Sequence, residues 1–240
     1  MLIKTKAIVL RTVKYGDNRL IVDLFTKEQG RLSFAVSVAQ SVKGKMKKQF
    51  FQPLSLLEVT GDVKPSVQLH RLKEVRLAWP YAHLPFDASK LAITFFIAEF
   101  LAASLKGEQR NEALYDYLEG SLIWLDTARE HYANFHLVLM MHVAKFLGFH
   151  PNLSGYTPQA VFDLRAGCFT EVMPLHHDVV ATQGAAIINT LMRMDFVNMH
   201  LFKMSRQQRN ELADFLILYY KLHLPAFPEL KTKEVLNTLF

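Results

Sequence analysis

Apolar and polar residues alternate along the first third of the chain in the pattern of half-buried β-strands. Five segments show this pattern, at residues 6–11, 20–25, 32–38, 54–59 and 67–77. Turn-forming residues separate them, at Tyr15-Gly16-Asp17-Asn18, Gln29-Gly30 and Gly61-Asp62. A period of two places alternate side chains on opposite faces of a strand, and Gly, Asn and Asp favour tight turns. The pattern predicts a small all-β domain.

The number of predicted strands indicates a small barrel. Five short strands in residues 1–78 match the open Greek-key barrel of the oligonucleotide-binding (OB) type, and an SH3-like barrel would give a similar pattern. The strand count does not distinguish the two, and we predict the OB-fold barrel.

After Trp79-Pro80 the apolar residues recur with helical spacing. The predicted helices cover residues 91–105, 112–128, 135–149, 184–194 and 206–224. Ser205 and Gln208 form a capping-box pattern at the start of the last helix. Between residues 150 and 180, Pro and Gly interrupt the pattern and predict a loop-rich insertion with a short hairpin. The predicted fold class is α+β, with an OB-fold barrel at residues 1–78 and a mostly α-helical domain at residues 79–240.

The charge distribution indicates a polyanionic partner for the barrel. Residues 1–78 contain 15 Lys and Arg against 6 Asp and Glu, a net charge of +9, whereas residues 79–240 carry a net charge of −3. A positive surface attracts polyanions through its long-range field and through counterion release. Nucleic acid is the expected partner. A membrane partner is not expected, because anionic membranes usually bind basic amphipathic helices and the basic segments here are extended.

The densest positive charge lies between the third and fourth predicted strands. Its four lysines are Lys43, Lys45, Lys47 and Lys48, and Phe50-Phe51 follow directly. Lysine ammonium groups can follow a phosphate backbone without reading bases, and aromatic rings offer faces on which unpaired bases stack. Two interpretations of the phenylalanines stay open, namely stacking on bases and packing in the barrel core.

Further side chains of the barrel are candidate DNA contacts. These are the cations Arg11, Lys14, Arg19 and Arg31, and Tyr15 as a further stacking ring. By strict alternation, Lys4, Lys6 and Lys14 would share one face of the first strand, with Arg11 on the opposite face. The excess of positive charge predicts binding more strongly than any one of these residues does.

No catalytic or metal-binding pattern is recognisable in the sequence. His176-His177-Asp178 lacks metal-ligand spacing and is predicted to be a surface turn. Cys168 is the only cysteine, so a disulfide or a cysteine-rich zinc cage within the chain is excluded. We expect no signal peptide, because the longest apolar run near the N-terminus, residues 7–10, is far too short for its core. We expect a cytoplasmic protein that is not an enzyme and uses no cofactor or metal.

Several short segments carry a family resemblance. They are Lys4-Thr5-Lys6-Ala7-Ile8-Val9-Leu10-Arg11, Tyr15-Gly16-Asp17, Leu24-Phe25-Thr26, Gly30-Arg31-Leu32, Gln52-Pro53-Leu54-Ser55-Leu56-Leu57-Glu58 and Phe146-Leu147-Gly148-Phe149. Together they resemble the RecO family of bacterial DNA repair and recombination mediator proteins. The first 60 residues carry most of the resemblance, and the helical half matches more by layout than by motif.

The resemblance implies a protein that works on single-stranded DNA without turning over a substrate. Members of the family anneal complementary strands. They act with RecR, and in some settings RecF, to load RecA onto DNA covered by single-strand-binding protein, whose acidic, hydrophobic tail they recognise. The implied partners are therefore single-stranded DNA, RecR and that tail, with RecA and RecF as indirect partners. Binding to double-stranded DNA stays open, and the implied location is the nucleoid.

The chain departs from the family pattern in one respect. Many members carry a four-cysteine zinc module in the helical half, and the equivalent stretch here, residues 151–180, retains only Cys168. We therefore predict no zinc. The segment Phe162-Asp163-Leu164-Arg165-Ala166-Gly167 is predicted to be the remaining scaffold of that module, held by apolar packing.

Two other functions remain compatible with the sequence. The first is a basic OB-type module that binds structured RNA, with the helical half as a protein-docking domain. Preference for folded RNA over single-stranded DNA would favour it, because A-form shape and the 2′-hydroxyl are recognised by different contacts. The second is a nucleic-acid enzyme with a dispersed site, which metal-dependent cleavage of labelled strands would reveal.

Overall fold

The computed structural model describes residues 1–38, 46–64 and 66–239, which form two compact units. The first unit comprises Met1–Thr127 and Leu230–Lys233, and the second comprises Ala128–Glu229 and Glu234–Phe240. The barrel thus shares a unit with helices α1 (Ala88–Ser104) and α2 (Glu112–Thr127). That residues 1–78 form a separate domain stays a prediction.

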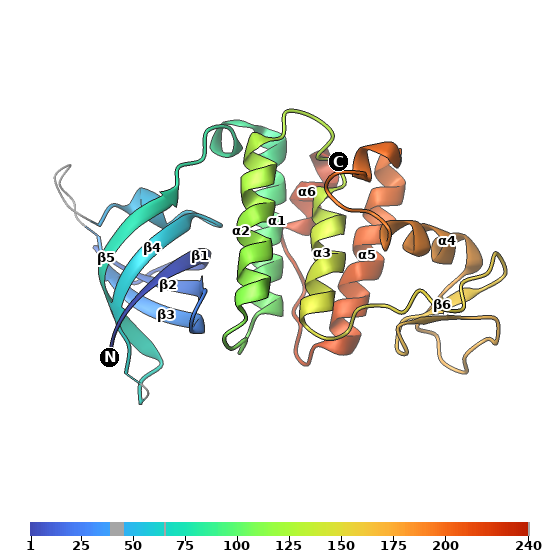
Figure 1. The fold of residues 1–240 in the computed structure, drawn as a ribbon, viewed down its shortest axis with the longest axis horizontal. Coiled ribbons are helices and arrows are strands. Elements are labelled where there is room, and N and C mark those ends of the chain that lie inside the picture. Colours follow the sequence, from blue (N-terminus) through green and yellow to red (C-terminus); the bar gives the residue numbers. More distant parts are fainter. Residues whose placement is uncertain (39–45, 65, 240) are drawn as a thin grey trace. The chain divides into compact units, whose positions relative to one another are not determined.

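Five strands close into a barrel in the order β1-β2-β3-β5-β4 (Figure 1). They are β1 (Leu2–Lys14), β2 (Arg19–Thr26), β3 (Gly30–Ser37), β4 (Leu56–Asp62) and β5 (Leu69–Trp79). β1 pairs with both β2 and β4, and β3 runs parallel to β5 while the other pairs are antiparallel. The predicted fold class, α+β with a five-stranded OB-type barrel followed by helices, is confirmed.

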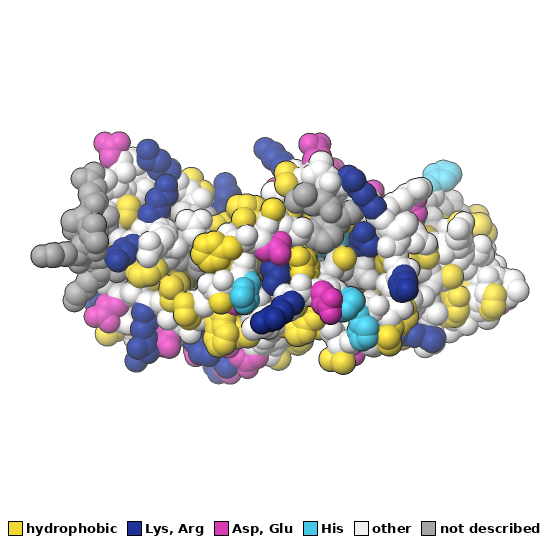
Figure 2. All heavy atoms as spheres, turned by 90° about the horizontal axis from the view of Figure 1, so that it is seen from above, with side chains coloured by type: hydrophobic (Ala, Val, Ile, Leu, Met, Phe, Trp, Pro, Cys, Tyr) yellow, Lys and Arg dark blue, Asp and Glu magenta, His cyan; other side chains and the backbone are white. Residues whose placement is uncertain are grey.

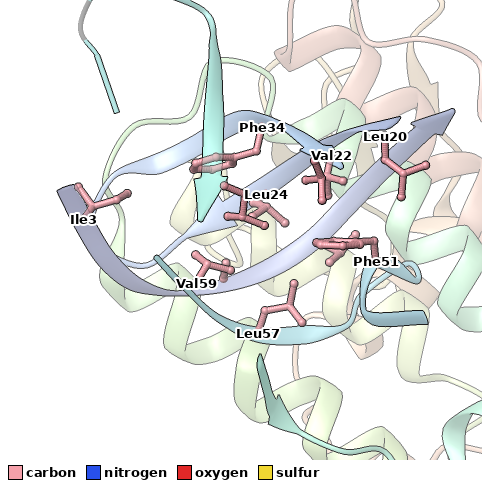
Figure 3. Close-up of a cluster of buried hydrophobic side chains, with 12 residues drawn as sticks. Ile3, Leu20, Val22, Leu24, Phe34, Phe51, Leu57 and Val59 are labelled. Atoms are coloured by element: carbon pink, nitrogen blue, oxygen red, sulfur yellow. The ribbon is translucent and has the colours of Figure 1, made fainter. Parts of the chain in front are cut away.

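Apolar side chains that alternate along the strands fill the barrel interior (Figure 3). In β2, for example, Leu20, Val22 and Leu24 point into this core. Phe51 enters the core from the short 3-10 helix η1 (Lys48–Phe51), and only 2% of its surface is exposed. Removal of this much apolar surface from water is the main force that stabilises the barrel.

A β-bulge in β1 changes which of its residues face outward. The register of pairing with β2 shifts after Val9, so that β1 has one extra residue there. An extra residue reverses the alternation beyond it. Arg11 therefore shares the outer face with Lys4 and Lys6. Lys14 lies on the opposite face of the strand, where it pairs with the core-facing Leu20. The predicted grouping of Lys4, Lys6 and Lys14 on one face was wrong because strict alternation does not foresee a bulge.

The turn between β2 and β3 approaches the connection between α1 and α2 closely. Gly30 has a φ of 71°, and a Cβ atom at this position would lie 2.4 Å from the backbone carbonyl carbon of Gln109. Glycine is required there both by the left-handed backbone and by the lack of space. The predicted Gln29-Gly30 turn is thus also a packing contact of the first unit.

One buried carboxylate on α2 fixes the connection between β5 and α1. Asp126 is 1% exposed and accepts hydrogen bonds from the backbone N–H groups of Ala82, His83 and Leu84, at 3.0, 2.9 and 2.8 Å. Burial acts to raise the pKa of Asp126, but these N–H groups outweigh it and lower the pKa below the ordinary value of 3.8. The connection, including the short 3-10 helix η2 (Leu84–Phe86), is thereby held in one conformation.

The second unit consists mainly of α3 (Phe135–Phe146), α4 (Thr182–Leu191), α5 (Arg206–His223) and α6 (Lys233–Leu239), with the 3-10 helix η3 (Met199–Leu201). Nine of the twelve residues of α3 are buried. The Tyr220 hydroxyl of α5 donates a hydrogen bond to the carbonyl oxygen of Met140 in α3, at 2.7 Å. The predicted capping box of Ser205 and Gln208 begins α5. Each described helix is too short or too polar to cross a membrane.

The predicted insertion contains a small sheet of the order β7-β6-β8. β6 (Val161–Asp163) and β7 (Cys168–Thr170) form the expected hairpin, and β8 (Val179–Val180) pairs with β6. The rings of Phe162 and Phe169 pack edge-to-face with centroids 5.0 Å apart. Apolar packing of these rings therefore helps to hold the small sheet together; that it is the scaffold of a former zinc module stays a prediction.

Candidate nucleic-acid interface

Two lysines of the barrel are neutralised by carboxylates on α2. The Lys6 ammonium lies 3.0 Å from Glu119, and the Lys27 ammonium lies 2.6 Å from Asp116. The hydrogen bond to Asp116 raises the pKa of Lys27, so this lysine stays charged. Ion pairs of this kind cancel much of the positive field on the side of the barrel that faces α2.

Arg31 also binds partners within the first unit. Its guanidinium lies 3.0 Å from the Asp23 carboxylate and donates a hydrogen bond of 2.6 Å to the carbonyl oxygen of Ala102 in α1. Only 18% of the side chain is exposed. The sequence identified Arg31 as a candidate DNA contact, whereas the structure places it in the packing between β3 and α1.

A basic groove lies on the other part of the barrel, where β3 and β5 run side by side; we call it the β3–β5 groove. It has a volume of about 830 Å³, and its described lining contains four cationic side chains against the single carboxylate of Asp62. The cations are Arg19, Lys64, Arg71 and Lys73. The rest of the lining consists mainly of apolar side chains, among them Val67 and Leu69.

The strand register explains the shape of this groove. Ala35 of β3 pairs with Arg71 of β5, and Ser37 of β3 pairs with Arg19 of β2. Two small side chains therefore lie between two arginines on the outer face of the sheet. Small residues leave the space above the sheet open, and the arginines border it on both sides. This arrangement suits a phosphate backbone, because guanidinium groups form bidentate hydrogen bonds to phosphate.

The groove cations are largely free of carboxylate partners. The Lys73 ammonium lies 3.9 Å from Asp62, a carboxylate that also lies 3.4 Å from the N-terminal ammonium. Arg19, Lys64 and Arg71 form no ion pair with any other described residue. The positive charge of the groove is therefore available to an anionic ligand, unlike that of Lys6, Lys27 and Arg31.

Lys64, Arg71 and Lys73 are groove residues that were not among the predicted DNA contacts. They lie in and before β5, where residues without a carboxylate separate them along the chain. Their spacing could have identified them. Arg71 and Lys73 are two residues apart, and such residues point to the same face of a regular strand. Arg19 is the predicted contact that the fold brings together with them.

The β1–β2 turn places two further candidates close to Arg19. The Tyr15 N–H donates a hydrogen bond of 2.9 Å to the carbonyl oxygen of Arg19, and 62% of the Tyr15 surface is exposed. Lys14 is exposed and pairs with Leu20 in the same hairpin. Arg11 is exposed and lies farther from this turn, and it is not part of the groove lining.

The two phenylalanines of the lysine-rich segment take different positions. Phe51 lies in the barrel core, so its ring has no face open to a base, and the core-packing interpretation holds for it. Phe50 is half-buried and lines a second groove together with Lys4 and Lys73. Lys48 is exposed and Lys47 is half-buried. The other two lysines of this segment, Lys43 and Lys45, lie outside the described residues.

The insertion does not provide a zinc-binding set. Its only cysteine is Cys168, and a structural zinc site needs four thiolate or imidazole ligands. Among the described residues, no three His, Cys, Asp or Glu side chains are grouped so that they could hold a metal ion. His176 lies in a bend with its Nε2 atom 3.3 Å from Asp163, in agreement with the predicted surface turn. A four-cysteine zinc site therefore does not fit this chain.

Comparison with known proteins covers both halves of the chain. The family profile for the recombination protein O N terminal matches residues 1–81, and that for the recombination protein O C terminal matches residues 85–234. The DNA repair protein RecO of Phocaeicola vulgatus is 45% identical over 240 residues, and that of Bacteroides fragilis is 43% identical over 241 residues. RecO of Flavobacterium psychrophilum is 37% identical, and each comparison spans the full length of both chains. The chain belongs to the RecO family of DNA repair proteins.

Proposed function

We propose that this chain is a recombination mediator that binds single-stranded DNA in the β3–β5 groove, anneals complementary strands and is not an enzyme. The observation that carries the proposal is the groove itself, with four cations against one carboxylate beside a sheet surface kept open by small side chains. Basic grooves of this kind bind single strands with little sequence preference, through the phosphate backbone.

Charge neutralisation explains how such a protein can act without a catalytic site. Two complementary strands repel each other through their phosphates, and a protein that neutralises one strand lowers that repulsion. The same contacts would help to displace single-strand-binding protein so that RecA can load. In this proposal RecR and the acidic tail of single-strand-binding protein bind the chain directly, RecA and RecF act with it indirectly, and all of this takes place in the cytoplasm at the nucleoid.

The experiment compares the salt dependence of oligodeoxythymidine binding between wild type and two triple variants. One variant removes the unpaired groove cations by Arg19→Ala, Lys64→Ala and Arg71→Ala. The logarithm of the affinity should then depend less steeply on the logarithm of the salt concentration, by about 2 units, because each phosphate contact to a single strand contributes about 0.7. The control removes three ion-paired cations of the same unit, by Lys6→Ala, Lys27→Ala and Arg110→Ala.

The control variant should keep a slope close to that of wild type, because its cations already face carboxylates. Equal slopes for the groove variant and wild type would refute the assignment of the groove. Competition with folded RNA separates the remaining alternative, since a module built for structured RNA would prefer it to single-stranded DNA.

A further inference from the structure

An uncharged aromatic groove lies at the far end of β5. It has a volume of about 520 Å³ and is lined by the η1–β4 connection, the β5–α1 connection and α1. Trp79, Tyr81, Phe86 and Phe95 contribute its rings, and none of the described residues that line it carries a charge. Figure 2 shows hydrophobic side chains gathered beside the barrel on this side of the first unit.

The rings of this groove are unusually open to solvent. Phe86 is 84% exposed, Phe95 is 46% exposed and Trp79 is 37% exposed. Single exposed apolar side chains are ordinary, but several aromatic rings that converge on one concave surface mark a binding site.

The walls of the aromatic groove are held in place by hydrogen bonds behind the rings. The Tyr81 hydroxyl donates to the carbonyl oxygen of Leu54 at 2.8 Å, and the Trp79 indole N–H lies 3.4 Å from Asp126. Asp126 also holds the backbone of the β5–α1 connection. The polar atoms of the rings are thus directed away from the groove, and a ligand meets ring faces that are already in position, which lowers the entropic cost of binding.

A path along β5 joins the aromatic groove to the β3–β5 groove. The β3–β5 groove shares Lys73 with a second groove of about 570 Å³. The lining of that second groove also contains two cations, Lys4 and Arg76, and two carboxylates, Glu58 and Glu74. That second groove shares Leu77 with the aromatic groove. The charge decreases along this path, because Arg76 is ion-paired with Glu58 and the aromatic groove is uncharged.

We infer that the aromatic groove binds unpaired bases of a single strand whose phosphates lie in the β3–β5 groove. This inference rests on the proposed function and extends its site. A phosphate in the aromatic groove would find no cation, whereas a base is uncharged and has a π-face that stacks on Trp or Phe. The Gln49 and Gln52 amides in the lining are suited to hydrogen-bond with base edges.

The first test measures affinities of wild type and Phe86→Ala for oligodeoxythymidines shorter and longer than one OB-fold site of about 4 to 16 nucleotides. Loss of one stacked base should weaken binding of the long strands roughly 5- to 150-fold. The shortest strands and the salt slope should be unaffected, because the phosphate contacts remain. Phe86 is 84% exposed, so its removal should leave the fold intact. Leu175→Ala, which removes a fully exposed apolar side chain from the second unit, is the control.

The second test uses the emission of Trp79. The chain has two tryptophans, and Trp124→Phe leaves Trp79 alone. Long oligodeoxythymidines should quench its emission in step with binding, since a stacked base is in direct contact with the indole.

The outcomes distinguish failure of base binding in the aromatic groove from failure of the proposed function. Suppose that Phe86→Ala binds long strands with unchanged affinity and salt slope, and that Trp79 is not quenched. This result would overturn base binding in the aromatic groove and leave the proposed function standing. Absence of single-strand binding in wild type would overturn both.

Discussion

The replacement Asp126→Asn tests whether one buried carboxylate fixes the β5–α1 connection. Its Oδ1 atom accepts from the N–H groups of His83 and Leu84, and its Oδ2 atom accepts from Ala82 and the Trp79 indole. An Asn side chain has one acceptor oxygen and one NH₂ group. In either orientation, two of these donors would therefore face another donor.

The expected loss of stability follows from these contacts. An unsatisfied buried donor costs about 1–3 kcal/mol. Both contacts of the Oδ2 atom, from Ala82 and Trp79, are part-buried, whereas the Oδ1 atom also accepts the buried contact of Leu84. The amide NH₂ should therefore turn toward Ala82 and Trp79, where water can hydrogen-bond to the donors that lose their acceptor. We expect Asp126→Asn to lower the free energy of unfolding of the first unit by about 2 kcal/mol. Asp116→Asn on the same helix should cost less than about 1 kcal/mol, because Asp116 is exposed and forms a surface ion pair.

Urea denaturation followed by tryptophan emission is the appropriate assay, since Trp79 and Trp124 both belong to the first unit. The pH dependence adds a second criterion. The pKa of Asp126 is lowered in the folded state, so its contribution is present above the unfolded pKa of about 3.9 and is lost as the pH falls through the lower folded value. The difference between wild type and Asp126→Asn should therefore shrink below about pH 4. A difference under about 0.5 kcal/mol at neutral pH, or one that does not change with acidification, would show that the Asp126 carboxylate does not stabilise the connection.

Three further predictions concern the barrel. Phe51→Ala should destabilise the first unit by about 3–5 kcal/mol in urea denaturation, because Phe51 is buried in the core; a fully stable variant with weakened DNA binding would instead support the stacking interpretation. Gly30→Ala should cost clearly more than Gly16→Ala, since both have positive φ but only Gly30 lacks space for a Cβ, and equal midpoints would contradict this. Alanine at all four lysines of the lysine-rich segment should flatten the salt slope for single strands by roughly 3 units, and an unchanged slope would exclude phosphate contacts there; the residues are Lys43, Lys45, Lys47 and Lys48.

The strands and long helices were predictable because their burial follows a simple period. The first two predicted helices, residues 91–105 and 112–128, correspond to α1 and α2 within three residues at each end. The seven-residue α6 was missed, since so short a segment gives little periodic signal. The strand face predicted for Lys14 was wrong because a bulge depends on the pairing of two strands and not on the pattern of one.

The candidate site was harder to predict than the fold because it is formed by barrel closure. Arg19 and Arg71 are far apart in the sequence and meet only because β3 pairs with both β2 and β5. Conversely, Lys27 and Arg31 contribute to the net charge of the barrel, yet their carboxylate and carbonyl partners neutralise them or hold them in the packing of the first unit. A count of charges along the chain cannot separate these two groups, since ion pairing depends on tertiary contacts.

The neighbouring Phe50 and Phe51 illustrate the same limit at short range. They are identical residues next to each other in a 3-10 helix, where successive side chains point in different directions. One lies in the core and the other lines a groove. The sequence could therefore identify the pair as important without assigning the two roles.

In our proposal the β3–β5 groove binds single strands so that they can anneal. The most direct measurement is the rate of annealing of two complementary labelled strands, free and covered by single-strand-binding protein. Wild type should accelerate annealing in both conditions, and the variant with Arg19→Ala, Lys64→Ala and Arg71→Ala should lose most of the acceleration while remaining folded. Failure of wild type to accelerate annealing in either condition, or full activity of the folded groove variant, would contradict the claim.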